Sequence, residues 1–284
     1  MLRIVTDGAA DMPEGWEKQY EINILPLRVL FGDKEMLQGR DLTPKNFYKI
    51  VLEKRIFPKT SLPSPDEIKD FYRKIAEKNE SILSIHVASK LSGTFSAVQT
   101  AARELVGEFN VYPFDSGAGS AAEGMMCREA RIMAQSGASV ANIIERLSEL
   151  RSKVTIIFTV ENLEFARLSG RISSFQTAIS SLLKVNPIIF LRDGLLQVGQ
   201  KVRTRQRALD TIVDEVRRRL GGQPTNLAVV HADTPETAQM LIEKIKARIP
   251  AVREIIMSEL SIVVAAHLGP GAIGIVAIPI GEAS

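Results

Sequence analysis

A hydroxyl-bearing turn at Ser92-Gly93-Thr94 lies between a short apolar run and a helical pattern, and it is suited to binding an anion. In open α/β sheets, ligands collect at the carboxyl ends of strands. A helix that begins here directs unpaired backbone N–H groups at the ligand, and Gly93 allows its oxygens to approach the backbone. The same turn would also serve as an ordinary helix N-cap, so the pattern fits both roles.

Thr60 and His267 are two further candidates for contact with a carboxylate. Thr60 precedes residues 62–65 (LPSP), whose prolines hold the backbone extended and present its hydroxyl, although the segment also fits a rigid lead into the next helix. His267 lies near the end of an apolar helix expected over residues 261–266, where the helix dipole favours an imidazolium. Such a histidine can donate to a carboxylate or only cap its helix.

Basic residues gather in the second half of the chain. Lys201 and Arg203 end an extended run from Leu195 to Val202, point the same way, and could meet an anionic partner or a phosphate. The three arginines at 217–219 are most simply a solvated helix face. The net charge of +3 is too small to predict nucleic-acid binding.

Several kinds of catalytic and metal site have no motif in the sequence. It contains no Walker A loop, no G-x-S-x-G elbow, no H-E-x-x-H and no zinc spacing of Cys and His. The single cysteine, Cys127, cannot form an intramolecular disulfide, which is typical of a reducing compartment. Asp7 and Asp11 interrupt the place of a signal-peptide core. We therefore expect a cytoplasmic protein with no metal and no cofactor.

Short β-branched runs alternate with amphipathic helical patterns, which predicts an α/β fold with mixed or parallel sheets flanked by helices. The length of 284 residues suits two lobes that share a cleft, at 1–155 and 156–284, with a hairpin-like elaboration at about 22–47. The predicted strands and helices cover these ranges: strands 2–6, 82–87, 154–160 and 226–231; helices 65–77, 95–106, 120–135, 139–150, 205–219 and 235–247.

Residues 261–281 contain no charged side chain, as a membrane helix would. The segment is interrupted by Gly269, Pro270, Gly271, Gly274 and Pro279, which makes it a poor helix in lipid. We expect a buried helix, a turn and a strand instead, and no transmembrane segment.

Taken together, these segments resemble the DegV family, the bacterial fatty-acid-binding proteins that serve fatty acid kinase. The resemblance runs nearly from end to end, although Gly8 replaces a common serine and Ala122 a common glycine. The matching segments are IVTDGAADMP (4–13), TSLPSP (60–65), SKLSGT (89–94), FDSGAGSAAEG (114–124), LEFARLSGRIS (163–173), VNPIIFLRDG (185–194), KVR (201–203) and HLGPGAIG (267–274).

The resemblance implies a long-chain fatty acid, such as palmitate, held between the lobes. Its carboxylate would meet Thr60, Ser92 and His267, with backbone N–H groups of Gly93 and Thr94 as further donors. Residues suggested for the wall around its tail are Ile179, Leu182, Leu183, Ile188, Ile262 and Val263.

In the family's scheme such a protein is a carrier and not an enzyme. A partner kinase would convert the carboxylate to an acyl phosphate, and Lys201, Arg203 and Arg171 would contact the kinase or the phosphate. Two alternatives remain: a stand-alone enzyme acting on a small carboxylate or phosphorylated metabolite, and nucleic-acid binding through the arginines of 201–219. The preferred acyl chain and the oligomeric state do not follow from the sequence.

Overall fold

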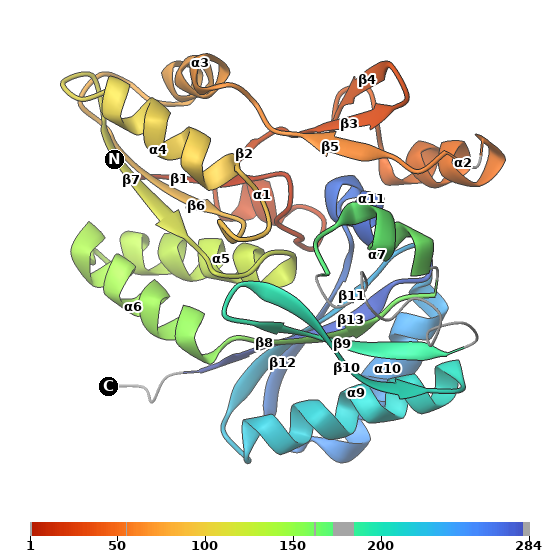
Figure 1. Cartoon of the computed structure of the whole chain (residues 1–284). Helices are drawn as coiled ribbons and strands as arrows, with labels where there is room; N and C mark the ends of the chain where they lie inside the picture. The colour runs from red at the N-terminus through yellow and green to blue at the C-terminus, as the bar shows by residue number, and fades with distance from the viewer. Residues whose placement is uncertain (1, 55, 162, 173–184, 281–284) are drawn as a thin grey trace.

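The chain forms an α/β structure with three sheets, shown in Figure 1 by a computed structural model. The structure describes residues 2–54, 56–161, 163–172 and 185–280. Two large sheets lie on either side of a central pair of helices, and further helices cover their outer faces. The predicted fold class of mixed and parallel sheets flanked by helices is confirmed.

The first sheet has four parallel strands in the order β2-β1-β6-β7. Helices α3 and α4 cover its outer face, while α5 and α6 lie on the inner side, between the two large sheets. The strands are β1 (Leu2–Asp7), β2 (Ile22–Leu25), β6 (Ser81–His86) and β7 (Asn110–Asp115); the helices are α1 (Trp16–Gln19), α3 (Pro65–Ile75), α4 (Thr94–Glu104), α5 (Ala121–Gln135) and α6 (Val140–Lys153).

The second sheet has six strands in the order β10-β9-β8-β13-β11-β12, antiparallel except for β11 and β12. Helices α9 and α10 bury its outer face in a separate apolar core. The strands are β8 (Thr155–Thr159), β9 (Asn186–Arg192), β10 (Leu195–Val202), β11 (Thr225–His231), β12 (Val252–Glu259) and β13 (Ile273–Pro279); the helices are α7 (Leu163–Ser169), α9 (Arg205–Leu220), α10 (Pro235–Arg248) and α11 (Ile262–Leu268).

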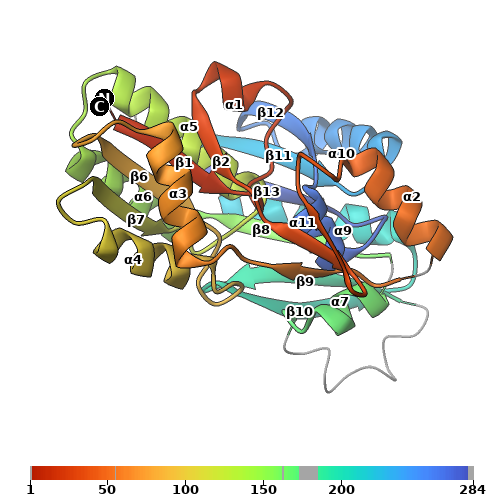
Figure 2. The same ribbon diagram turned by 90° about the horizontal axis from the view of Figure 1, so that it is seen from above.

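A small third sheet extends from the first toward the second. It has the antiparallel order β4-β3-β5, formed by β3 (Arg28–Phe31), β4 (Lys34–Leu37) and β5 (Lys59–Ser61), with α2 (Pro44–Lys54) inserted before β5. Both β3 and β5 contact α11, so this sheet reaches across to a helix beside the second sheet, as Figure 2 shows from above. The expected elaboration at 22–47 is therefore divided, because β2 pairs with β1 in the first sheet and only residues 28–37 form a hairpin.

Local sequence signals account for several helix starts. Ser64 and Glu67 form a reciprocal capping box at the start of α3, with Pro65 at the first helical position. Residues 261–279 form a capped helix, a turn and β13, as expected. No helix in the described part of the chain is long and apolar enough to cross a membrane.

Candidate functional site

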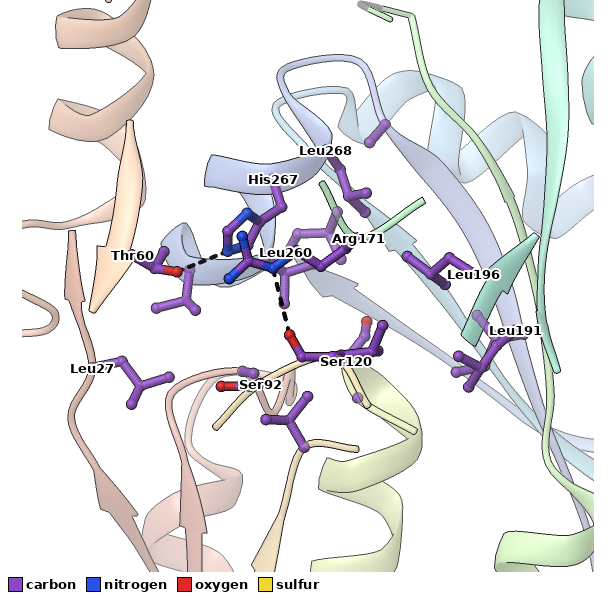
Figure 3. Close-up of a pocket in the computed structure, with 18 of the residues that line it drawn as sticks. Leu27, Thr60, Ser92, Ser120, Arg171, Leu191, Leu196, Leu260, His267 and Leu268 are labelled. Atoms are coloured by element: carbon purple, nitrogen blue, oxygen red, sulfur yellow. Dashed lines mark hydrogen bonds between the residues drawn. The ribbon is translucent and has the colours of Figure 1, made fainter. Parts of the chain in front are cut away.

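A cavity opens where the three sheets meet, and Figure 3 shows its polar and apolar ends. We call the group of Thr60, Ser92, Thr94, Arg171 and His267 the polar end. Most other lining side chains are aliphatic or aromatic. They come from strands of the second sheet, from α11 and from the loops beside the strands of all three sheets: Leu27, Leu62, Val87, Leu91, Ile156, Phe158, Leu191, Leu196, Val230, Leu260, Val263, Val264, Leu268 and Ile273.

The turn after β6 brings hydroxyls and backbone donors together at the polar end. The Ser92 and Thr94 hydroxyl oxygens are 2.9 Å apart, and the Thr94 N–H donates to Ser92 Oγ at 3.3 Å. Gly93 is the N-cap residue of α4 and provides no side-chain cap. A Cβ at Gly93 would lie 3.2 Å from Leu62, so glycine relieves crowding beside the cavity. The predicted group Ser92, Gly93 and Thr94 thus lies on the cavity wall.

Thr60 on β5 and His267 on α11 meet at the cavity. The Thr60 hydroxyl oxygen is 2.8 Å from His267 Nε2, although 207 positions separate the two residues. If the imidazole carries its proton on Nε2, this N–H donates to Thr60 and leaves the Thr60 proton free to point into the cavity. The pair can therefore present a hydroxyl donor to an anion.

The imidazole of His267 is neutral, which corrects the imidazolium expected from its place near the end of α11. Burial lowers the pKa of His267 to about 3, and the nearby Arg171 charge lowers it further. The loss of water around a charged ring outweighs the helix dipole, which contributes only about 0.3–1 kcal/mol at an exposed site.

Arg171 supplies positive charge to the polar end. Among the described residues that line the cavity, it is the single cation, and none of them is a carboxylate. Its Nη1 donates to the Ser169 carbonyl at 2.6 Å and its Nε to the Leu91 carbonyl at 3.4 Å. Arg171 is partly buried, so its charge is only partly hydrated, and this burial lowers the pKa of Arg171. An anion in the cavity would replace the missing water.

The side chains of β9 alternate between the two faces of the second sheet, and one of these faces contributes to the apolar end of the cavity. Ile189 and Leu191 on β9 face the inner core, whereas Ile188 and Phe190 face α9 on the outer side. Of the residues suggested for the wall around a tail, Val263 lines the cavity, while Ile188 and Ile262 are buried elsewhere. Ile179, Leu182 and Leu183 lie outside the described residues.

Lys201 and Arg203 are not brought to the cavity. Both are exposed, at and just beyond the end of β10, whose residue Leu196 lines the cavity near the other end of the strand. Their role as contacts for a partner stays a prediction.

One polar lining residue, Ser120, was not proposed from the sequence. It follows β7 just as Ser92 follows β6, so both segments leave the same edge of the parallel sheet. That shared edge is the signal that could have identified Ser120.

Comparisons with known proteins identify the family of the chain. A family model described as uncharacterised proteins of the DegV family matches residues 1–280. Protein DegV of Bacillus subtilis is 35% identical over 96% of this chain and 98% of its own length. A fatty acid-binding protein of Thermotoga maritima is 31% identical over 96% of each chain.

Solved structures show the same fold. A crystal structure of DegV from Bacillus subtilis, described as a fatty acid binding protein, superposes with a TM-score of 0.87 at 33% identity, covering 98% of this chain and 99% of that one. A Thermus thermophilus DegV family protein, solved in a study of fatty acid binding, gives a TM-score of 0.90 at 28% identity with the same coverage.

The lowered pKa of His267 predicts an acid-sensitive contribution to stability. Between about pH 3 and 6.5 the unfolded chain binds a proton that folded His267 does not, so stability falls as the pH drops through this window. His267→Gln keeps a hydrogen-bonding group for Thr60 but does not titrate. Between about pH 7 and pH 4, the free energy of unfolding measured by urea denaturation should fall less in the variant than in the parent. The difference between the two losses should reach up to about 3 kcal/mol. Equal losses in both proteins would contradict this.

Proposed function

This chain belongs to the DegV family, and we propose that it binds a long-chain fatty acid with its carboxylate at the polar end of the cavity. The observation that carries the proposal is one cavity with hydroxyls and a guanidinium at one end and hydrocarbon over the rest. A fatty acid has the same division of polarity. The names of the relatives from Bacillus subtilis and Thermotoga maritima support this ligand class.

The polar end can offset the cost of burying a carboxylate. An ionised carboxylate taken from water needs several donors or a cation. Thr60, Ser92 and Thr94 offer hydroxyls, and Arg171 offers charge. We therefore place Arg171 beside the carboxylate of the fatty acid, closer to the ligand than the peripheral contact expected from the sequence.

The tail is proposed to extend toward β9 and β10. In Figure 3, Leu191 and Leu196 lie on the opposite side of the site from Thr60 and Ser92. Each methylene buried there contributes about 0.8 kcal/mol, so a chain of palmitate length gains most of its affinity from this end. A small polar metabolite would leave the apolar wall in contact with water, and the stand-alone enzyme is therefore the weaker alternative.

A carrier function follows if a partner fatty acid kinase transfers the γ-phosphoryl group of ATP to the bound carboxylate. One carboxylate oxygen attacks phosphorus, ADP leaves, and an acyl phosphate remains in the cavity. We propose that the exposed cations Lys201 and Arg203 attract this partner. The chain itself would supply binding and orientation.

The protein as purified should contain a fatty acid. Native mass spectrometry, followed by organic extraction and lipid identification, should show about one fatty acid per chain, because an apolar cavity of this kind retains its ligand. A ligand-free mass that stays unchanged after addition of palmitate would favour the enzyme acting on a small metabolite.

Replacing Ser92 should weaken binding by removing one donor to the carboxylate. A hydrogen bond to a charged group contributes about 1.5–3 kcal/mol, so Ser92→Ala should raise the Kd for palmitate at least about tenfold. Ser96→Ala is the matched control, because Ser96 is exposed on α4, the helix that follows Ser92, and does not line the cavity. Unchanged titration of Ser92→Ala would remove Ser92 from the site.

Reversing the charge at Lys201 and Arg203 should impair the kinase reaction and leave fatty acid binding intact. The double variant Lys201→Glu, Arg203→Glu should raise the KM of the kinase for the loaded carrier about tenfold, through slower association. Lys74→Glu, Lys78→Glu makes the same charge change at exposed positions in and just beyond α3. Equal effects of the two double variants would show that only net charge matters.

A further inference from the structure

A buried carboxylate lies directly behind the cavity. Asp11 follows β1, is 2% exposed, and joins two elements of the site. One of its oxygens accepts a hydrogen bond from the Ser120 hydroxyl, and the other accepts one from the Ser261 N–H at 2.7 Å. Ser120 precedes α5 and lines the cavity, while Ser261 caps α11, the helix that carries His267.

The backbone at Ser120 has a conformation that side-chain-bearing residues rarely adopt, and α5 packs closely against Asp11. Ser120 has φ 56° and ψ −144°, a region that favours glycine, and its hydroxyl does not cap its own helix. One turn later, a Cβ at Gly124 would lie 2.4 Å from the Asp11 carbonyl oxygen. The absence of that Cβ allows α5 to approach the Asp11 backbone.

We propose that Asp11 is a positioning residue that determines whether the Ser120 hydroxyl donates or accepts a hydrogen bond in the cavity. The inference rests on the proposed function. An ionised carboxylate can only accept, so the Ser120 proton points at Asp11 and the cavity meets oxygen lone pairs. A protonated Asp11 can donate to Ser120 Oγ, which frees the Ser120 proton for the carboxylate of a fatty acid. The bond from the Ser261 N–H persists in both states.

Of Asp11 and the two ionisable side chains that face it, Asp11 is the one whose protonation state changes in mild acid. Burial raises the pKa of Asp11 to about 6. Glu123 faces it from α5, and burial, followed by the charge of Asp7 on β1, raises the pKa of Glu123 well above its usual range. Tyr48 faces it from α2, and burial raises its pKa as well. Both shifts favour the neutral forms of Glu123 and Tyr48.

In Figure 3, Ser120 and Ser92 both lie on the opposite side of the site from His267. Ser120 is therefore placed to add one more donor to the polar end. The consequence is tighter fatty acid binding when Asp11 is protonated and weaker binding when it is ionised.

Asp11→Asn tests this directly, because the asparagine carbonyl can accept from the Ser261 N–H while its amide donates to Ser120. The variant should imitate protonated Asp11 at every pH. Dissociation constants of a fluorescent long-chain fatty acid would be measured from about pH 5 to pH 8 for both proteins. The ratio of the two constants cancels the titration of the ligand itself. We expect the parent to bind about tenfold more weakly than Asp11→Asn above about pH 6, and equally well below it.

Ser120→Gly provides an independent variant, because glycine suits the φ of 56° and lacks the hydroxymethyl side chain. Its affinity should match that of the parent at high pH and fall about tenfold below it at low pH, where the parent gains a donor. If Asp11→Asn fails to fold by circular dichroism, this pH-dependent ratio alone supports the proposal, and a constant ratio overturns it.

The proposal is also overturned if the ratio of the dissociation constants of Asp11→Asn and the parent does not change with pH. A variant that binds more weakly than the parent by the same factor at every pH would show a purely structural role for Asp11. Failure of the parent to bind any fatty acid across the whole range would overturn the proposed function and the inference with it. That outcome differs from the others, which all require binding by the parent.

Discussion

The floor of the cavity depends on the buried carboxylate of Asp7. This group is fully buried at the end of β1, where it accepts hydrogen bonds from the N–H groups of Ala9 at 2.9 Å and Val87 at 3.2 Å. Its other neighbour is His86 Nδ1, at 2.9 Å. A buried carboxylate without donors is costly, so these contacts fix the loops after β1 and β6 relative to each other. Ala9 and Val87 both line the cavity, so this contact set fixes the part of its wall that they form.

The network continues away from the cavity and anchors a helix. His86 Nε2 lies 2.7 Å from the Ser84 hydroxyl, which lies 2.7 Å from the Tyr72 hydroxyl on α3. Because every member is paired, the network adds rigidity to the edge of the sheet at which Ser92 and Thr94 are presented. Rigid hydroxyls lose little conformational entropy when a ligand binds, so more of the free energy of each hydrogen bond contributes to affinity.

The strands and helices that carry the site could be predicted from local sequence, because apolar periodicity and capping residues act over a few positions. Ser92 and Thr60 could be proposed because each lies beside such an element. The charge state of His267 could not, since it depends on burial by segments remote in sequence. Nor could the position of Gln38, whose side chain fills the space beside Gly8 where a Cβ would lie 1.7 Å from its Oε1. The division of β9 between two cores likewise needed the layered structure.

The contact between Thr60 and His267 also bears on how the protein is made. A ribosome releases β5 long before α11 is synthesised, so a nascent chain can complete its first sheet without having a complete binding site. A ligand that binds only the complete site stabilises finished molecules by mass action and leaves truncated ones open to proteolysis. Because its polar groups come from both halves of the chain, the cavity couples retention of any ligand to completion of synthesis.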